Sequence, residues 1–143
     1  MTSYTPELSI GQVAERTGLS VHTLRLYERE GLFTNPVMRT TNDRRIYSEW
    51  DVEWLCNCVK FRASGMPLAT IRHLAELVRQ GPGNEAERLA LLRSHEQHIL
   101  DRIAELIDCL DLIASKVRTY ETHLAQGTAG QLWSSPADTG PAV

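Results

Sequence analysis

The clearest pattern along the chain is a regular spacing of apolar residues in its second half. They occur at Leu89, Leu92, Ile99, Ile103, Leu106, Leu110, Ile113, Val117, Tyr120 and Leu124. From Ile99 onward the intervals alternate between four and three residues, which is the a/d spacing of a coiled coil. No glycine or proline interrupts residues 85–126. The pattern predicts one helix of roughly forty residues, about 60 Å long at about 1.5 Å per residue.

Such a helix is too long to bury its apolar stripe against the preceding part of the chain alone. The stripe therefore predicts a partner helix, most simply the same helix of a second copy. The alternative is a helix folded back within one chain, which is less favoured because no later segment is long enough to pair with it. The residues expected at the dimer interface are Leu92, Ile99, Ile103, Leu106, Leu110, Ile113, Val117 and Tyr120.

The first part of the chain contains short helices separated by turn residues. Segments 10–16 and 21–30 are predicted helices, with Gly18 in the turn between them, Ser20 as an N-cap and Gly31 as a C-terminal stop. Two short helices joined in this way form a helix-turn-helix, and the second helix of that unit enters the major groove of DNA. Its solvent side is expected to carry His22, Thr23, Arg25, Tyr27, Glu28 and Arg29.

Residues 34–47 are predicted to form a small β-hairpin. Pro36 prevents a helix, and Asn42 and Asp43 supply a turn between two short β-capable ends. Three arginines lie at or near the expected tip: Arg39, Arg44 and Arg45. A basic hairpin beside a helix-turn-helix is a wing, which contacts phosphates or the minor groove.

Two more helices complete this segment. Ser48 is the predicted cap of a third helix that runs to about Ala63, with Asp51 at the capping-box position. A fourth helix follows from Pro67 to about residue 80. Lys60, Arg62 and Arg72 give the pair a basic edge. Trp50 and Trp54 lie four residues apart on one face of the third helix; we expect core packing there rather than the lining of a small pocket.

Charge and composition narrow the function. The net charge of −3 argues against a polyanionic partner, but residues 16–47 carry six arginines against three acidic residues. The local balance decides nucleic-acid binding, so the acidic total does not exclude it. The sequence contains no glycine-rich phosphate loop, metal triad or nucleophile elbow, so an enzyme is not expected. Nor is a bound cofactor or metal ion.

Other features of the sequence bear on its cellular location and on its C-terminal segment. With three cysteines, no apolar stretch of membrane-spanning length and a polar N-terminus, the expected location is the cytoplasm. The last segment is rich in Gly, Pro, Ser, Thr and Ala and is predicted to be disordered. We expect a mainly α chain: a winged helix-turn-helix DNA-binding domain over 1–80, a dimerisation helix over 81–125 and a tail over 126–143.

On these motifs the sequence resembles the MerR family of transcription regulators. The resemblance rests on segments 10–14, 17–20, 23–25, 27–28 and 31–32, and then on Arg39, Asn42, Arg45, Tyr47, Asp51, Gly65 and Ile71. Two departures stand out. Leu26 replaces a common aromatic residue, and the wing reads Asn42-Asp43-Arg44-Arg45 where the family usually has Asn-Gly-Tyr-Arg.

The resemblance implies a homodimer held by an antiparallel coiled coil. The dimer would bind a near-palindrome in an overlong promoter spacer and distort it, which realigns the promoter for RNA polymerase. Thr23 and Arg25 would contact bases or the groove, while Tyr27, Arg39, Arg45 and Lys60 would contact phosphates. The full expected DNA-binding set is His22, Thr23, Arg25, Tyr27, Arg39, Asn42, Arg44, Arg45, Tyr47, Lys60 and Arg62.

The effector is less constrained. The family's metal sensors carry cysteines at the start of the dimer helix and beyond it, positions where this chain has none. Segment 50–124 is most similar to the aldehyde-responsive, AdhR-like branch. Its reactive cysteine position is occupied here by Lys60, with Cys56 and Cys58 nearby, so electrophile sensing by a thiol is a hypothesis. The alternatives are a DNA-binding protein or repressor without an effector, and a coiled-coil adaptor.

Overall fold

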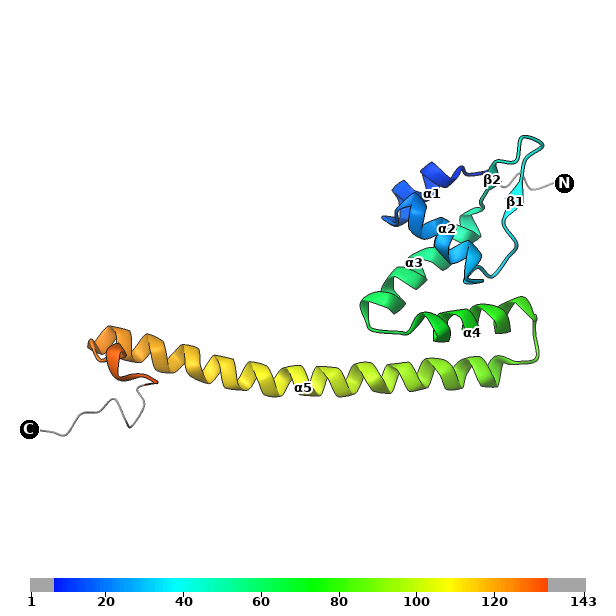
Figure 1. Ribbon diagram of the computed structural model, residues 1–143. Coiled ribbons are helices and arrows are strands. Elements are labelled where there is room, and N and C mark those ends of the chain that lie inside the picture. Colours follow the sequence, from blue (N-terminus) through cyan, green and yellow to red (C-terminus); the bar gives the residue numbers. More distant parts are fainter. Residues whose placement is uncertain (1–6, 134–143) are drawn as a thin grey trace, which may run out of the picture. The chain divides into compact units, whose positions relative to one another are not determined.

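The computed structural model describes residues 7–133 of the 143-residue chain. The elements follow in the order α1 (Ile10–Thr17), α2 (Val21–Arg29), β1 (Met38–Arg39), β2 (Arg45–Ile46), α3 (Glu49–Ala63), α4 (Leu68–Arg79), α5 (Glu85–Gln126) and a short 3-10 helix, η1 (Ala129–Gln131) (Figure 1). The chain divides into two compact units, Met1–Gln97 and His98–Val143. The first unit thus includes the first turns of α5, whereas the predicted boundary lies at residue 80.

Local capping signals in the sequence determine where the short helices begin. α1 starts with a capping box in which Ser9 and Gln12 satisfy each other's backbone N–H groups. The Ser20 hydroxyl accepts a hydrogen bond from the Thr23 N–H at the start of α2. Ser48 and Asp51 form the predicted capping box of α3. The predicted helix-turn-helix and third helix are confirmed.

The wing is a two-stranded antiparallel hairpin in which Met38 pairs with Ile46 and Arg39 with Arg45. Asp43 lies in its turn with φ of 60°, a left-handed conformation that aspartate tolerates better than most residues. Asp43 therefore provides the left-handed residue of the wing turn without a glycine at this position. Leu8 and Tyr47 form an additional antiparallel bridge beside the hairpin.

The core of the first unit lies where α1, α2, α3, α4 and the wing meet. Its most completely buried side chains are Tyr47, Leu24, Leu32, Leu55, Met66, Ile71, Val13 and Cys58. The start of α5 is attached to this unit, since Leu91 packs on the core and the Ser64 hydroxyl lies 2.8 Å from His95 Nε2. The core fixes the orientation of α2, the helix that carries the candidate DNA contacts.

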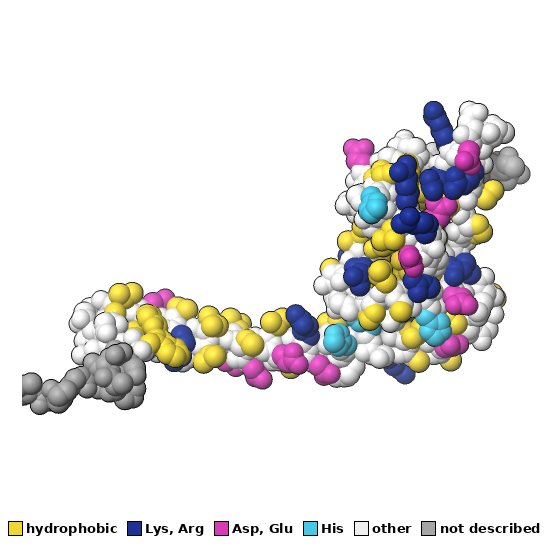
Figure 2. Space-filling view, in the orientation of Figure 1, with side chains coloured by type: hydrophobic (Ala, Val, Ile, Leu, Met, Phe, Trp, Pro, Cys, Tyr) yellow, Lys and Arg dark blue, Asp and Glu magenta, His cyan; other side chains and the backbone are white. Residues whose placement is uncertain are grey.

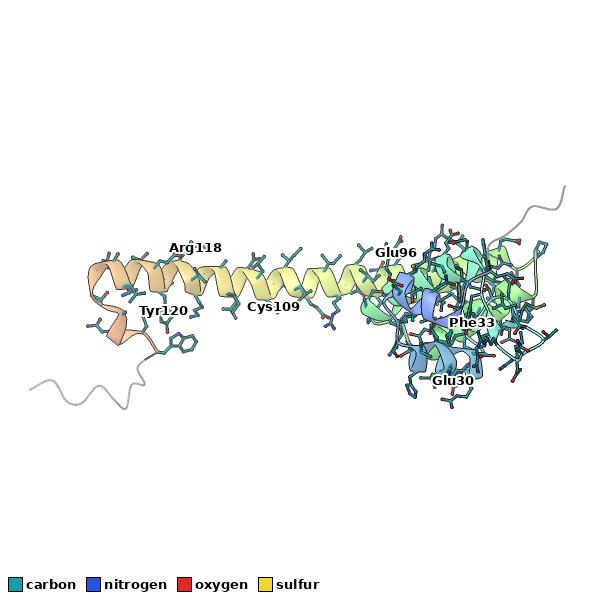
Figure 3. The ribbon with its side chains drawn as sticks, turned by 90° about the horizontal axis from the view of Figure 1, so that it is seen from above. Glu30, Phe33, Glu96, Cys109, Arg118 and Tyr120 are labelled. Carbon is teal, nitrogen blue, oxygen red and sulfur yellow. The ribbon has the colours of Figure 1, made fainter. Side chains whose placement is uncertain are left out.

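The long helix is present as predicted, and its apolar positions are exposed. α5 spans 42 residues. In the second unit Ile103, Leu106, Leu110, Ile113 and Val117 are all exposed, with Leu110 at 63%. Cys109, Arg118 and Tyr120 can be seen projecting from the helix (Figure 3). The a/d stripe is therefore an open apolar surface.

The segment after α5 differs from the predicted tail over residues 127–133. The Thr128 N–H donates to the carbonyl oxygen of His123, the two side chains approach to 2.6 Å, and η1 follows. The Lys116 ammonium lies 4.4 Å from the centroid of the Trp133 ring, a cation–π contact. These contacts order the segment, so the predicted disorder is wrong there. The prediction for 134–143 lies outside the described residues.

A substitution at Leu24 of α2 measures how much the core contributes to the stability of the first unit. Replacing Leu24 with Ala should lower the free energy of unfolding by about 3 kcal/mol, since a fully buried leucine loses both its contacts and its volume. Urea denaturation measures this change. Leu112→Ala, the same truncation at an exposed position of α5 outside the a/d stripe, should cost less than about 1 kcal/mol. Equal losses in the two variants would contradict the core assignment.

Candidate DNA interface

The exposed side of α2 carries part of the predicted DNA-binding set. His22 and Arg25 are exposed, and Thr23 is half-buried. The Ser20 hydroxyl also donates to the Thr23 hydroxyl at 2.9 Å, which holds Thr23 in place at the first turn of the helix. Figure 2 shows a concentration of Lys and Arg side chains over the part of the molecule that contains α2 and the wing. This surface has the charge that a DNA backbone requires.

A single carboxylate links α2 to the wing. Glu28 bonds Arg45 Nε through one oxygen, and its other oxygen lies 3.5 Å from a terminal nitrogen of Arg39. The hydrogen bond that Arg45 donates to Glu28 raises the pKa of Arg45 above its ordinary value. Arg39 also pairs with Asp43 across the turn at 3.3 Å. The two wing arginines are thereby held against α2, so helix and wing form one surface.

Arg25 of α2 and Arg44 of the wing are two available cations on this surface. Both side chains are exposed, and neither forms an ion pair within residues 7–133. Asn42 is exposed in the wing turn. The structure therefore brings together seven predicted residues from α2 and the wing: His22, Thr23, Arg25, Arg39, Asn42, Arg44 and Arg45.

The two predicted tyrosines are core residues, so the expectation that Tyr27 lies on the solvent side of α2 is wrong, while a DNA contact by either tyrosine stays a prediction. Tyr27 is 6% exposed and lies on the same face of α2 as Leu24, three residues earlier. Tyr47 is 1% exposed and packs against Phe33 with ring centroids 5.8 Å apart. Burial raises the pKa of Tyr47 to about 12. Both rings support α2 and the wing from inside the core.

The cations on α3 and α4 have different roles. Lys60 is exposed, whereas the Arg62 guanidinium donates to the Met66 carbonyl oxygen at 2.9 Å and braces the turn between α3 and α4. Arg72 donates to the carbonyl oxygen of Glu30 and pairs with its carboxylate at 2.7 Å. Arg72 is therefore a brace for the end of α2 and not a free basic edge.

Sequence reasoning missed that Arg79 acts with Arg72. Arg79 donates to the carbonyl oxygens of Gly31 and Phe33, just beyond α2. The two arginines are seven residues apart, which places them on one face of α4. The carbonyl groups at a helix C-terminus carry partial negative charge and attract such cations. The seven-residue interval is the signal that could have indicated this pairing.

The cysteines do not form a paired sensor. Cys58 is completely buried, and burial raises its pKa to about 12, so the thiolate needed for reaction with an electrophile is suppressed. This environment disfavours Cys58 as the sensor, and the sensor role itself stays a prediction. Cys56 is half-buried and packs against the core, and Cys109 is exposed. Within the described residues no group of three or more His, Cys, Asp or Glu could hold a metal ion.

The two tryptophans of α3 do not share one environment. Trp54 is buried, and its Nε1 donates to the Leu32 carbonyl oxygen at 2.7 Å. Trp50 is 52% exposed, although it lies one turn earlier on the same helix. Both line a cavity that also reaches Val78 and Arg88. The expectation of simple core packing is therefore wrong for Trp50, and the alternative of a small pocket is the arrangement observed.

A helix-turn-helix with a basic wing defines the chain as a DNA-binding protein. Residues 8–77 match the family model described as MerR HTH family regulatory protein. An uncharacterized HTH-type transcriptional regulator of Haemophilus influenzae is 34% identical over 117 residues, which cover 82% of this chain and 86% of that relative. The regulator YfmP of Bacillus subtilis is 36% identical over 129 residues, covering 87% and 91%. The chain belongs to the MerR family of transcription regulators and is not an enzyme.

A solved structure agrees with this conclusion. The MerR family regulator HiNmlR, described as lacking the sensor domain and bound to promoter DNA, has a TM-score of 0.77 and 31% identity. The match covers 89% of this chain and 100% of that chain. AdhR of Bacillus subtilis is 31% identical over only 94 residues, so the aldehyde-responsive branch stays a prediction. No helix among the described residues is long and apolar enough to cross a membrane.

The Glu28 bridge makes a prediction about DNA affinity. Glu28→Gln removes a negative charge beside the arginines of α2 and the wing and frees Arg39 and Arg45, so affinity for random duplex DNA should rise about threefold to tenfold. Preference for a specific site over random DNA should fall because the wing loses its anchor on α2. Fluorescence anisotropy titrations over a salt series measure both effects. Glu105→Gln, the same charge change on α5, is the control, and an equal affinity gain there would contradict the role of Glu28.

The cysteine environments make a second prediction. At pH 8 iodoacetamide should modify Cys109 and leave Cys58 unmodified in the folded protein, because alkylation requires an accessible thiolate. Mass spectrometry of the digested protein gives the extent at each site. In urea both cysteines should react. Equal rates for Cys58 and Cys109 in the folded protein would show that the burial of Cys58 is wrong.

Proposed function

We propose that the protein binds a near-palindromic promoter site as a homodimer and controls transcription by distorting the DNA between the two half-sites. The observation that carries this proposal is the exposed a/d stripe of α5, in a chain whose other unit presents a winged helix-turn-helix. One chain offers one α2 and one wing. Two chains joined through α5 offer two, which is what a site with two inverted halves requires.

Pairing of two α5 helices would bury side chains that are exposed in one chain. Seven of the eight predicted interface side chains are exposed in one chain: Leu92, Ile103, Leu106, Leu110, Ile113, Val117 and Tyr120. Ile99 is half-buried. Complete burial of one large apolar side chain contributes about 1.5–3 kcal/mol, so pairing the stripes would stabilise the assembly strongly. An antiparallel pair places the two α5 dipoles in opposition, which is favourable.

The contacts proposed for each half-site follow from position. Thr23 and Arg25 lie on the exposed side of α2 and would reach base edges in the major groove. Arg39, Arg44 and Arg45 of the wing would contact phosphates, with His22 and Asn42 at the margins. Lys60 of α3 is a further candidate for a phosphate contact. That HiNmlR is bound to promoter DNA supports a promoter as the partner of this chain as well.

Distortion is proposed because it allows a bound regulator to control RNA polymerase. A rigid pair of α2–wing surfaces can bend or untwist the base pairs between the half-sites. The deformation would realign promoter elements that a long spacer holds out of register. A protein that only organises or represses DNA would bind the same site without this effect.

A thiol effector site is a further part of the proposal, now limited to Cys56. Cys56 is half-buried on α3, near the core that positions α2. A covalent adduct there would push against the core and alter DNA binding. In a reporter strain treated with an aldehyde, Cys56→Ser should abolish the response; an unchanged response would remove the thiol hypothesis and leave the DNA-binding proposal intact.

Transcription in vitro tests the function directly. Two promoters that differ only in spacer length, one normal and one lengthened, are transcribed with and without the protein. Stimulation of the lengthened promoter alone supports realignment of the promoter elements. Repression of both supports the alternative, a DNA-binding repressor.

Two leucines of α5 that lie two residues apart, Leu110 and Leu112, provide a matched pair for the same assay. Leu110→Glu places a charge in the a/d stripe and should abolish dimerisation and promoter binding. Leu112→Glu introduces the same charge outside the stripe and should retain both. Sedimentation equilibrium reports the oligomeric state. A Leu110→Glu variant that remains dimeric and active would contradict pairing through α5.

A further inference from the structure

A cavity of about 240 Å³ lies between α3, α4 and the start of α5. Six residues line it: Trp50, Glu53, Trp54 and Asn57 of α3, Val78 of α4 and Arg88 of α5. All six belong to the first unit. An apolar cavity of about 150 Å³ is large enough to bind benzene, so this one can hold a single ring with a substituent.

The two indoles in the wall are held in place by their own N–H groups. Trp50 Nε1 donates to the buried Thr34 hydroxyl at 3.0 Å, and Trp54 Nε1 donates to the Leu32 carbonyl oxygen. Both acceptors belong to the segment that follows α2. The polar atoms of the rings are therefore satisfied inside the protein, and the remaining ring surface is apolar. Since Trp50 is half-exposed, its surface is available to a ligand.

The cavity is lined by one residue of each charge, Arg88 and Glu53, and they differ in whether they already have partners. The Arg88 guanidinium is already engaged, because it donates to Asn84 Oδ1 at 2.6 Å and to the carbonyl oxygens of Gly81 and Leu77 at the end of α4. Those carbonyl groups carry partial negative charge and offset its positive charge. Glu53 is exposed and forms no hydrogen bond or ion pair within the part of the chain described. Aromatic rings also attract cations.

We propose that this cavity is a binding site for a compact aromatic cation, such as a single ring that carries an alkylated ammonium group. The ring would pack against Trp50 and Trp54, and the cation would lie near Glu53. A ligand there would touch α3, α4 and α5 at once and stiffen their packing. Both indoles are hydrogen-bonded to the segment after α2. A ligand bound in the cavity would therefore also affect the position of the end of that helix.

Nuclear magnetic resonance of the full-length protein tests the site without DNA, so its outcome is independent of the promoter proposal. The chain has three tryptophans and hence three indole N–H signals. Trp50→Phe and Trp133→Phe variants identify them. Titration with benzyltrimethylammonium should shift the Trp50 and Trp54 signals saturably and leave the Trp133 signal, which belongs to the second unit, unchanged.

Two comparisons identify the ligand class. Benzyl alcohol, a neutral molecule with the same ring, should bind about tenfold more weakly, as should benzyltrimethylammonium to Glu53→Gln. Glu15→Gln removes the same charge from the exposed side of α1 and should change nothing.

Three results would overturn the proposal. They are no saturable shift of the Trp50 and Trp54 signals, equal affinity for the neutral ring, and unchanged affinity in Glu53→Gln. A second copy of the chain covering the cavity would give the first of these.

Discussion

The organisation of this protein depends on the apolar stripe of α5. Leu106, Leu110 and Ile113 lie exposed on a helix of 42 residues, and water contact at these positions is unfavourable. A second α5 with the same spacing is a surface of matching length and chemistry. If the stripes of two chains pair, the resulting dimer carries two α2–wing surfaces. Dimerisation, two-fold DNA symmetry and promoter control then all follow from this pairing.

A second constraint is that α2 and the wing act as one surface. Tyr27 and Tyr47 are buried in the core under this surface, and Glu28 connects the helix to the wing arginines through ion pairs. From the other side Arg72 and Arg79 hold the carbonyl groups at and beyond the end of α2. The proposed readout by DNA deformation would need positioning of this kind, because a wing not held by α2 would follow the DNA rather than bend it. Several of the arginines stabilise the fold that presents the remaining ones.

Much of the fold could be predicted because its signals are local. Ser20, Ser48 with Asp51, and the glycines mark helix ends, and the heptad spacing identifies α5. The errors concern contacts between distant segments. The burial of Tyr47 arises from the Leu8 bridge and from Phe33, and the double ion pair of Glu28 exists only once the wing lies against α2. Trp50 and Trp54 share a helix face and both line the cavity, but Trp50 lies in the first turn of α3 and is half-exposed. Tyr27 is different, since its three-residue interval from Leu24 already indicated the buried face.

The most direct test of the account is to select bound duplexes from random DNA with the full-length protein and sequence them. Each chain has one α2, and pairing through α5 would hold two of them at a distance set by the length of that helix. The account therefore predicts two inverted copies of one half-site at a fixed separation, bound by two chains. The same selection with the Leu110→Glu variant, which should not pair through α5, should recover no such repeat. Recovery of a single unrepeated half-site by the wild-type protein, bound by one chain, would contradict the central claim.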